Sequence, residues 1–265
     1  MKSFSIGLIC LLFIVSSCDE ETTSTTENSE TTTSHNESFD ARAKREIVAA
    51  LGIPTNEKYS IRIYKEFISS DTIKDAIITV NRMEYAINES IRNQREAKAA
   101  ETGYTGNYNY IFYYDGELDK ISSPIFAPSS PGRELDVEFK SIVSPARKDL
   151  ILGYRIRNSG WKCYFSVFND HDFRMIFQWK SFDFAGEDNP EVLFHSYETN
   201  PSQVPKDIAI YTSEIDSYTK NIGDIYQYVP SITKKKELKL KFFLDLSAKK
   251  YRLYPEFAKN LPKKI

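Results

Sequence analysis

The chain has 265 residues, a formal net charge of −2 at neutral pH and an aromatic content of 14%. The charge is unevenly placed: residues 234–265 hold eleven Lys and Arg against three acids, a stretch that could contact acidic glycans, lipid head groups or nucleic acid. We favour a solvated edge strand protected by lysines and expect no nucleic acid as a partner. The sequence contains no HExxH, GxSxG, CxxC or GxGxxG motif and no P-loop, so it indicates none of the catalytic classes that these motifs mark.

The first residues are typical of a secretory signal peptide. Lys2 supplies a positive charge, and the stretch from Phe4 to Val15 is apolar and uncharged. This stretch is shorter than the ~20 residues that a membrane-spanning helix needs. We therefore expect residues 1–17 to be removed during export, and the mature protein to have no transmembrane helix.

The residues that close this stretch, Val15-Ser16-Ser17-Cys18, resemble the lipobox of bacterial lipoproteins. The resemblance implies that the chain is cut before Cys18 and that lipid on this cysteine anchors the protein to a membrane. Stable anchoring needs more than one acyl chain, because each buried methylene contributes only about 0.8 kcal/mol. Cys18 is therefore the expected site of lipid attachment.

Residues 18–39 are expected to form a disordered tether. Up to Ser38 they are almost wholly Thr, Ser, Glu and Asn, without a large apolar residue. The acidic run Asp19-Glu20-Glu21 resembles the surface-export signal of lipoproteins from the Bacteroidota. This resemblance implies an outer-membrane lipoprotein of the cell envelope that is displayed at the cell surface.

The rest of the chain, residues 40–265, is expected to be a single β-rich domain that opens with a helix. Asp40 is placed to cap this helix, which should end at Leu51. The apolar spacing predicts a second, inserted helix over residues 83–100. Most of the remaining sequence alternates apolar and polar residues with period two, which is typical of strands.

A short sequence motif, Lys-Asp followed by a run of apolar residues, occurs three times in this domain. Its aspartates are Asp75, Asp149 and Asp207, and each motif follows another predicted strand across a polar or proline-containing turn. The recurrence predicts a mainly β fold of three repeated antiparallel units of about four strands each. These units should start near residues 58, 134 and 191.

The second unit contains the clearest hairpin, in which strands over residues 161–169 and 173–184 flank a polar turn at Asp170-His171-Asp172. The apolar residues that should share one face of the second strand are Phe173, Met175, Phe177 and Trp179. This pattern predicts a sheet with one buried side. Cys163 lies in the first strand and is interpreted as a small buried apolar residue.

The phrase from Asp71 to Ile78 resembles the FG-GAP or VCBS repeat, in which an acidic turn leads into a strand of a β-propeller blade. The resemblance implies propeller-like units and makes Asp71 and Asp75 candidate calcium ligands, because calcium prefers oxygen ligands. The turns before Asp149 and Asp207 lack the other acidic ligands of that family. A structural role, in which the carboxylate bonds to backbone amides of the turn, is the alternative for all three repeated aspartates.

Three units are fewer than the ~4 to 8 blades that close a propeller. A β-sandwich and a trefoil-like barrel therefore remain open as alternative arrangements. No cofactor other than calcium is indicated.

The surplus of aromatic residues is the one positive indication of a binding surface, because exposed Tyr and Trp side chains stack on sugar rings and contact proteins. We therefore expect a non-catalytic, membrane-anchored protein that binds a glycan or a protein. A structural or assembly component of an envelope complex is the alternative. A hydrolase that acts on envelope polymers is the least favoured hypothesis.

The anchor can be tested directly. Replacing Cys18 with alanine removes the thiol that accepts the lipid, so we expect the Cys18→Ala protein to move from the membrane to the soluble fraction. Cell fractionation with immunoblotting measures this change. Cys163→Ala is the control and should stay with the membrane; a Cys18→Ala protein that also stays there would contradict lipid attachment at Cys18.

Overall fold

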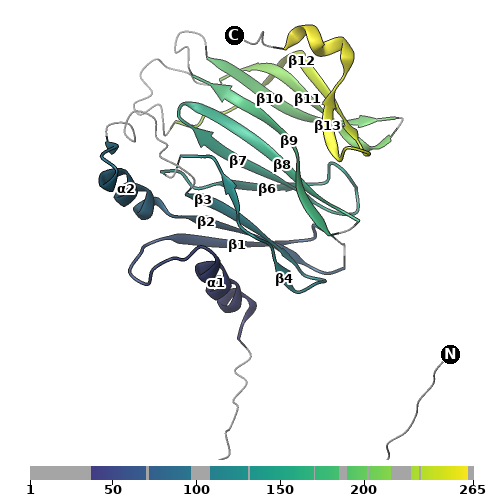
Figure 1. The fold of residues 1–265 in the computed structure, drawn as a ribbon. Helices are drawn as coiled ribbons and strands as arrows, with labels where there is room; N and C mark the ends of the chain where they lie inside the picture. Colours follow the sequence, from purple (N-terminus) through teal and green to yellow (C-terminus); the bar gives the residue numbers. More distant parts are fainter. Residues whose placement is uncertain are drawn as a thin grey trace, which may run out of the picture. The chain divides into compact units, whose positions relative to one another are not determined.

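The structure is a computed structural model that describes residues 37–69, 72–96, 108–130, 132–169, 171–184, 190–201, 203–215, 228–232 and 234–261. Within these residues the fold is mainly β, as predicted. Thirteen antiparallel strands form two sheets, accompanied by two α-helices and one 3-10 helix (Figure 1). None of the described helices is both long and apolar enough to cross a membrane. The predicted signal peptide, Cys18 and nearly all of the predicted tether lie outside the described residues.

Helix α1 runs from Phe39 to Ala50, and the predicted cap was wrong. Ser38 is the N-cap, and its hydroxyl accepts a hydrogen bond from the amide of Ala41 at 3.3 Å. Serine and aspartate both cap helices, but only Ser38 has the extended backbone that a cap requires. Asp40 lies inside the first turn and instead forms an ion pair with Lys65 at 2.8 Å.

The five-stranded sheet forms what we call the first unit. Its strands follow one another as an antiparallel meander, in which the last two short strands both pair with the third. They are β1 (Ser60–Glu66), β2 (Asp75–Asn81), β3 (Asn109–Asp115), β4 (Lys120–Ile121) and β5 (Ile125–Ala127).

Helix α2 (Met83–Arg92) is the predicted inserted helix, but it ends eight residues before the predicted boundary at residue 100. Gln94 has a φ of +54°, a left-handed backbone that cannot continue a helix. The helix buries Ala86 and Ser90, while its larger apolar side chains Met83, Ile87 and Ile91 are exposed. The apolar spacing thus predicted the helix but not which side chains are buried.

The eight-stranded sheet contains two further meanders. The strands of the second unit are β6 (Asp136–Lys140), β7 (Asp149–Ile156), β8 (Ser159–Phe168) and β9 (Asp172–Asp183). Those of the third unit are β10 (Glu191–Asn200), β11 (Gln203–Glu214), β12 (Lys234–Asp245) and β13 (Lys250–Leu253), followed by a 3-10 helix (Pro255–Asn260). β9 and β10 pair at two positions only, Asp183 with Glu191 and Phe182 with Val192. The second and third units are therefore joined into one sheet by a short stretch of strand pairing.

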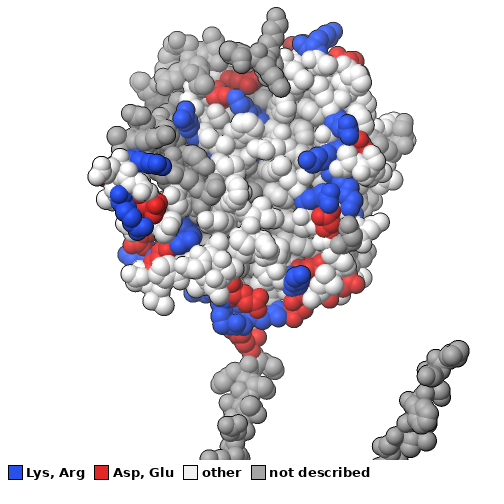
Figure 2. All heavy atoms as spheres, viewed as in Figure 1, with Lys and Arg blue, Asp and Glu red and all other residues white. Residues whose placement is uncertain are grey.

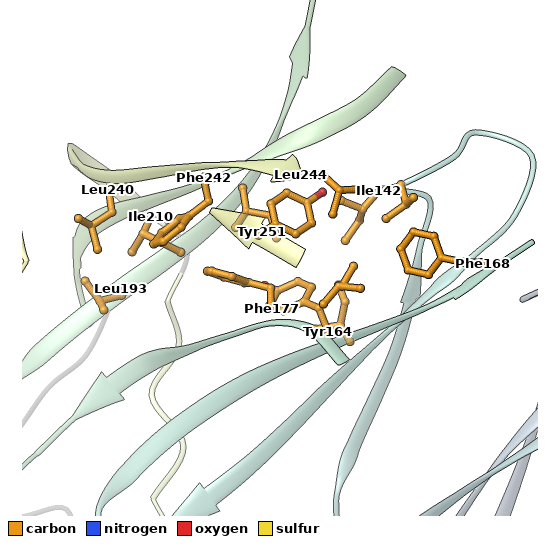
Figure 3. Close-up of a cluster of buried hydrophobic side chains, with 14 residues drawn as sticks. Ile142, Tyr164, Phe168, Phe177, Leu193, Ile210, Leu240, Phe242, Leu244 and Tyr251 are labelled. Carbon is orange, nitrogen blue, oxygen red and sulfur yellow. The ribbon is translucent and has the colours of Figure 1, made fainter. Parts of the chain in front are cut away.

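The three units pack face to face (Figure 1). One face of the second unit, carrying Leu152 and Phe165, packs on the first unit. Its opposite face, carrying Tyr164 and Phe177, packs on the third unit, and Figure 3 shows the ring of Phe177 next to that of Phe242. Helix α1 covers the remaining face of the first unit. The second unit is therefore the middle layer of the domain.

The predicted hairpin of the second unit is present as β8 and β9, but the expectation of one buried side was wrong. The register between the two strands shifts beside Met175, which is a β-bulge. As a result, Phe173 stacks on Tyr113 of the first unit, with ring centroids 4.6 Å apart, whereas Phe177 packs on Phe242 of the third unit at 4.7 Å. Both sides of this sheet are buried, because each side has a neighbouring unit.

Asp75 and Asp149 occupy corresponding places, since each begins the second strand of its unit. In both, atom Oδ2 accepts hydrogen bonds from the backbone amides six and seven residues earlier. These amides belong to Ile68 (3.1 Å) and Ser69 (2.6 Å) for Asp75, and to Ile142 (2.8 Å) and Val143 (2.8 Å) for Asp149. Each carboxylate thus closes the turn that leads into its strand.

Asp207 lies in β11, the second strand of the third unit, and makes a related contact. Its carboxylate accepts a hydrogen bond from the side chain of Asn200, again seven residues earlier, at 3.3 Å. It also accepts from the hydroxyl of Tyr254 at 3.1 Å and lies 3.3 Å from the ammonium of Lys241. All three repeated aspartates are buried.

Backbone hydrogen bonds next to the repeated aspartates, in the turns that lead into their strands, connect consecutive units. The amide of Lys148 donates to the carbonyl of Phe67 in the first unit at 2.8 Å, and the amide of Lys206 donates to the carbonyl of Ile142 in the second unit at 2.9 Å. Each lysine directly precedes a repeated aspartate. In the second and third units, the Lys-Asp motif therefore combines a contact within its own unit with a contact to the unit before it.

The hydrogen bonds of the Asp149 carboxylate predict that its removal has a large effect on stability. Asp149→Ala leaves the two buried amides of Ile142 and Val143 without an acceptor, at about 1–3 kcal/mol each, so we expect the free energy of unfolding to fall by about 2–6 kcal/mol. Asp149→Asn keeps an acceptor oxygen and should lose less than half as much. Urea denaturation measures both changes. Asp136→Ala removes an exposed acid and should shift stability by less than about 0.5 kcal/mol; equal losses in all three variants would contradict this role.

Candidate functional site

A groove of about 310 Å³ opens on the face of the second unit that also carries Tyr164. Strands β6 to β9 line it, together with the segment 228–232. Charged side chains of both signs line it: Glu134, Asp136, Glu138, Arg133, Arg155 and Lys162. This mixture of groups makes the groove the candidate binding site.

Gly153 forms the floor of the groove between two charged walls. It pairs with Asp136 on one neighbouring strand and with Lys162 on the other, so all three residues are in register across β6, β7 and β8. A methyl group on Gly153 would lie 3.1 Å from the Cβ of Asp136. The Asp136 side chain therefore lies against Gly153, in space that a larger residue would need, and Lys162 flanks Gly153 from the other side. The backbones of this acid and this base are two strand spacings, roughly 10 Å, apart.

Asp136 and Lys162 are the two charged side chains of the groove that have no partner. Within the described residues, neither forms a hydrogen bond or an ion pair. Asp136 is exposed, whereas Lys162 is half-buried, and this burial lowers the pKa of its ammonium group against the opposing effect of the Glu138 carboxylate. Both groups are available to a ligand.

The other charged groups of the groove are engaged. Glu138 pairs with Lys140 at 2.6 Å on the same strand, and Glu134 pairs with Arg62 of the first unit. Arg155 donates to the carbonyl of Arg157 at 2.9 Å and to the carbonyl of Tyr228. Arg155 therefore holds the segment 228–232, which supplies the apolar side of the groove through Val229, Pro230 and Ile232.

A buried chain of hydrogen bonds lies beside Lys162. The carbonyl of Lys180 can only accept, so Nε2 of His195 donates to it at 2.8 Å, and Nδ1 of His195 accepts from the hydroxyl of Tyr164 at 2.7 Å. The hydroxyl of Tyr197 lies 3.1 Å from that of Tyr164 and donates to it. Burial, with a further contribution from the charge of Lys162, lowers the pKa of His195 to about 3, which keeps the imidazole neutral.

The structure does not bring the residues predicted from the sequence into this groove. Cys18 and Asp71 lie outside the described residues. The carboxylate of Asp75 accepts from the amides of Ile68 and Ser69, from the hydroxyl of Ser69 at 2.9 Å and from the amide of Gly116 at 2.9 Å. These donors occupy both oxygens, so Asp75 serves the turn. Among the described residues, no group of three or more His, Cys, Asp or Glu side chains is placed to hold a metal ion.

Cys163 and His171 have structural surroundings. Cys163 is buried, and burial raises the pKa of its thiol to about 12, which removes the thiolate that a nucleophile needs. Nδ1 of His171 lies 2.7 Å from a carboxylate oxygen of Asp115, so the hairpin turn of the second unit is bound to the first unit.

An apolar cleft of about 440 Å³ lies between β5 of the first unit and the second unit. Phe126 and Met175 line it and are exposed to 55% and 41%. Its polar groups, the hydroxyl of Tyr154 and the amide of Gln178, bond to each other. The cleft therefore has few groups that could orient a polar ligand, in contrast to the groove.

Charges of both signs are mixed over the surface. On the face shown in Figure 2, the charged side chains lie mainly towards the edges, with acids next to bases. The lysines of β12 follow the same rule: Lys239 pairs with Glu191, and Lys241 lies 3.2 Å from Glu198. In both arrangements, acids lie next to bases.

The sequence alone did not single out Asp136, Gly153 and Lys162. Lys162 lies in a predicted strand, where it shares one face with Tyr164 while Trp161, Cys163 and Phe165 lie on the other. Because both faces carry apolar residues, the alternation does not say which face is buried. The sequence matches no protein-family profile, no curated protein and no solved structure. The site therefore stands on its geometry.

The neutral His195 predicts a dependence of stability on pH. Its pKa of about 3 in the folded protein lies below the ordinary value of 6.5, so the unfolded chain takes up the proton first, and stability that is complete above pH 6.5 is lost as the pH falls towards 3. Between pH 6.5 and about pH 5 this amounts to about 2 kcal/mol. Urea denaturation at both pH values should show the loss in the unchanged protein and a smaller one in His195→Gln. Equal losses in the two proteins would exclude His195 as the source.

Proposed function

We propose that this chain is an outer-membrane lipoprotein, anchored through lipid on Cys18 and displayed at the cell surface, whose folded domain binds a saccharide in the groove without catalysing a reaction. The signal-like stretch, the lipobox-like residues before Cys18 and the acidic run after it support the export and the anchor. The unpaired carboxylate of Asp136 beside the glycine floor is the observation that carries the binding role.

The groups in the groove suit a ligand rich in hydroxyl groups. Ionised carboxylates only accept hydrogen bonds, and ammonium and guanidinium groups only donate them, whereas a hydroxyl does both. A saccharide can therefore donate to Asp136 and accept from Lys162 with hydroxyls on opposite sides of one ring. The volume of about 310 Å³ lies at the lower end of the ~300–1,000 Å³ that is usual for ligand pockets, which suits one or two sugar rings.

The surroundings of the two acids on β6 favour binding over hydrolysis. A glycosidase needs one carboxyl group that burial keeps protonated, and a second that acts as a base or nucleophile. Asp136 is exposed, and Glu138 is held by Lys140 at 2.6 Å. Neither acid has the apolar surroundings of a general acid.

Saccharide binding can be measured with the lipidated protein extracted in detergent. We expect a glycan array to return a defined set of oligosaccharides, and Asp136→Ala to weaken their affinity at least about tenfold, because a hydrogen bond to a charged group contributes about 1.5–3 kcal/mol. Titration calorimetry with the best oligosaccharide gives the two dissociation constants.

Glu117→Ala is the matched control, because Glu117 is an exposed acid in the turn between β3 and β4. Its affinity should equal that of the unchanged protein. An array without any bound saccharide would refute the proposed function. Unchanged affinity in Asp136→Ala would show that the saccharide binds elsewhere.

A further inference from the structure

Lys162 occupies a position that is apolar in the first unit. Two residues after the repeated aspartate, Ile77 pairs with Tyr113 in the first unit and Ile151 pairs with Tyr164 in the second. Two residues before these tyrosines stand Ile111, which is fully buried between units, and Lys162. A lysine thus replaces a core isoleucine at the interface between the second and third units.

This lysine does not help the fold. A half-buried ammonium loses part of its hydration, and the nearby carboxylates of Glu138 and Asp136 offset that loss only in part, because neither forms an ion pair with Lys162 within the described residues. The lowered pKa of Lys162 reflects the same loss. Glu138, the acid that acts on it most strongly, is engaged by Lys140. Groups that weaken the fold in this way are typical of functional sites.

The groove limits the ligand that Lys162 can bind. Asp136 and Glu138 line the same groove, so a doubly charged phosphate would be repelled by these carboxylates. A single carboxylate meets less repulsion. It also forms a charge-assisted hydrogen bond with an ammonium group, which is about twice as strong as a neutral one. The ligand must then offer hydrogen-bond donors on its other side, where Asp136 lies.

We propose that the groove recognises an acidic saccharide, in which the carboxylate of a uronic acid binds the ammonium of Lys162 and ring hydroxyls of the same sugar donate to Asp136. A sugar ring carries its carboxylate and its distant hydroxyls on opposite sides, which matches a base and an acid on the two strands that flank Gly153. This inference rests on the proposed saccharide-binding function and specifies its ligand class.

The test uses an array of oligosaccharides in matched pairs, each as the free uronate and as its methyl ester, with the lipidated protein in detergent. We expect the unchanged protein to prefer the free acids at least about tenfold, which is the contribution of one charge-assisted contact. Lys162→Met should lose this preference. Lys120→Met, which removes an exposed lysine of β4, should keep it.

Urea denaturation of Lys162→Met separates ligand recognition from folding. Its unfolding midpoint should equal or exceed that of the unchanged protein, because an unpaired, half-buried charge is removed. A large decrease in the midpoint would show that Lys162 stabilises the fold and would overturn the inference.

The outcomes on the array are distinct. Equal binding of acids and esters, or an acid preference that survives in Lys162→Met, overturns the acidic-sugar inference and leaves the proposed function intact. An array on which neither the acids nor the esters bind overturns both.

Discussion

The second unit carries apolar side chains on both of its faces, and both must be kept from water. Tyr113 of the first unit covers Phe173 on one side, and Phe242 of the third unit covers Phe177 on the other. Burial of this kind contributes roughly 25 cal/mol per Å² of apolar surface, so a sheet with two apolar faces is stable only as a middle layer. The packing of the two outer units on this sheet follows from that requirement.

The outer faces of the first and third units differ in how they are kept from exposing apolar surface. Helix α1 covers the outer face of the first unit through Ile47. The outer face of the third unit carries paired charges, among them Lys241 with Glu198 and Asp207. Neither unit leaves a broad apolar sheet face within the described residues, so the packing there does not demand a further unit. The repeated aspartates lie in the turns where consecutive units meet; the carboxylates of Asp75 and Asp149 accept from backbone amides there, and that of Asp207 accepts from the side chain of Asn200.

The groove arises where the contact between the second and third units is not filled by large apolar side chains. Charged and small side chains such as Asp136, Lys162 and Ser181 line this end of the interface, whereas rings such as Tyr164 fill the adjoining part. Lys162 introduces a charge at a position where the first unit has Ile111. Elsewhere, apolar side chains fill the contacts between the units, whereas at this site a charged side chain takes their place. This substitution lowers the stability of the fold.

The sequence by itself determined the elements, because period-two alternation and the Lys-Asp motif are local properties. It predicted the strands that contain Asp75, Asp149 and Asp207, the hairpin at His171 and the burial of Cys163. Only the tertiary structure decided which faces are covered and which charges have partners. The bulge beside Met175 reverses the faces of one strand, and Asp136, Gly153 and Lys162 meet across three strands. Strand periodicity depends on neighbours in the chain, whereas burial and ion pairing depend on neighbours in space, which no single stretch of sequence contains.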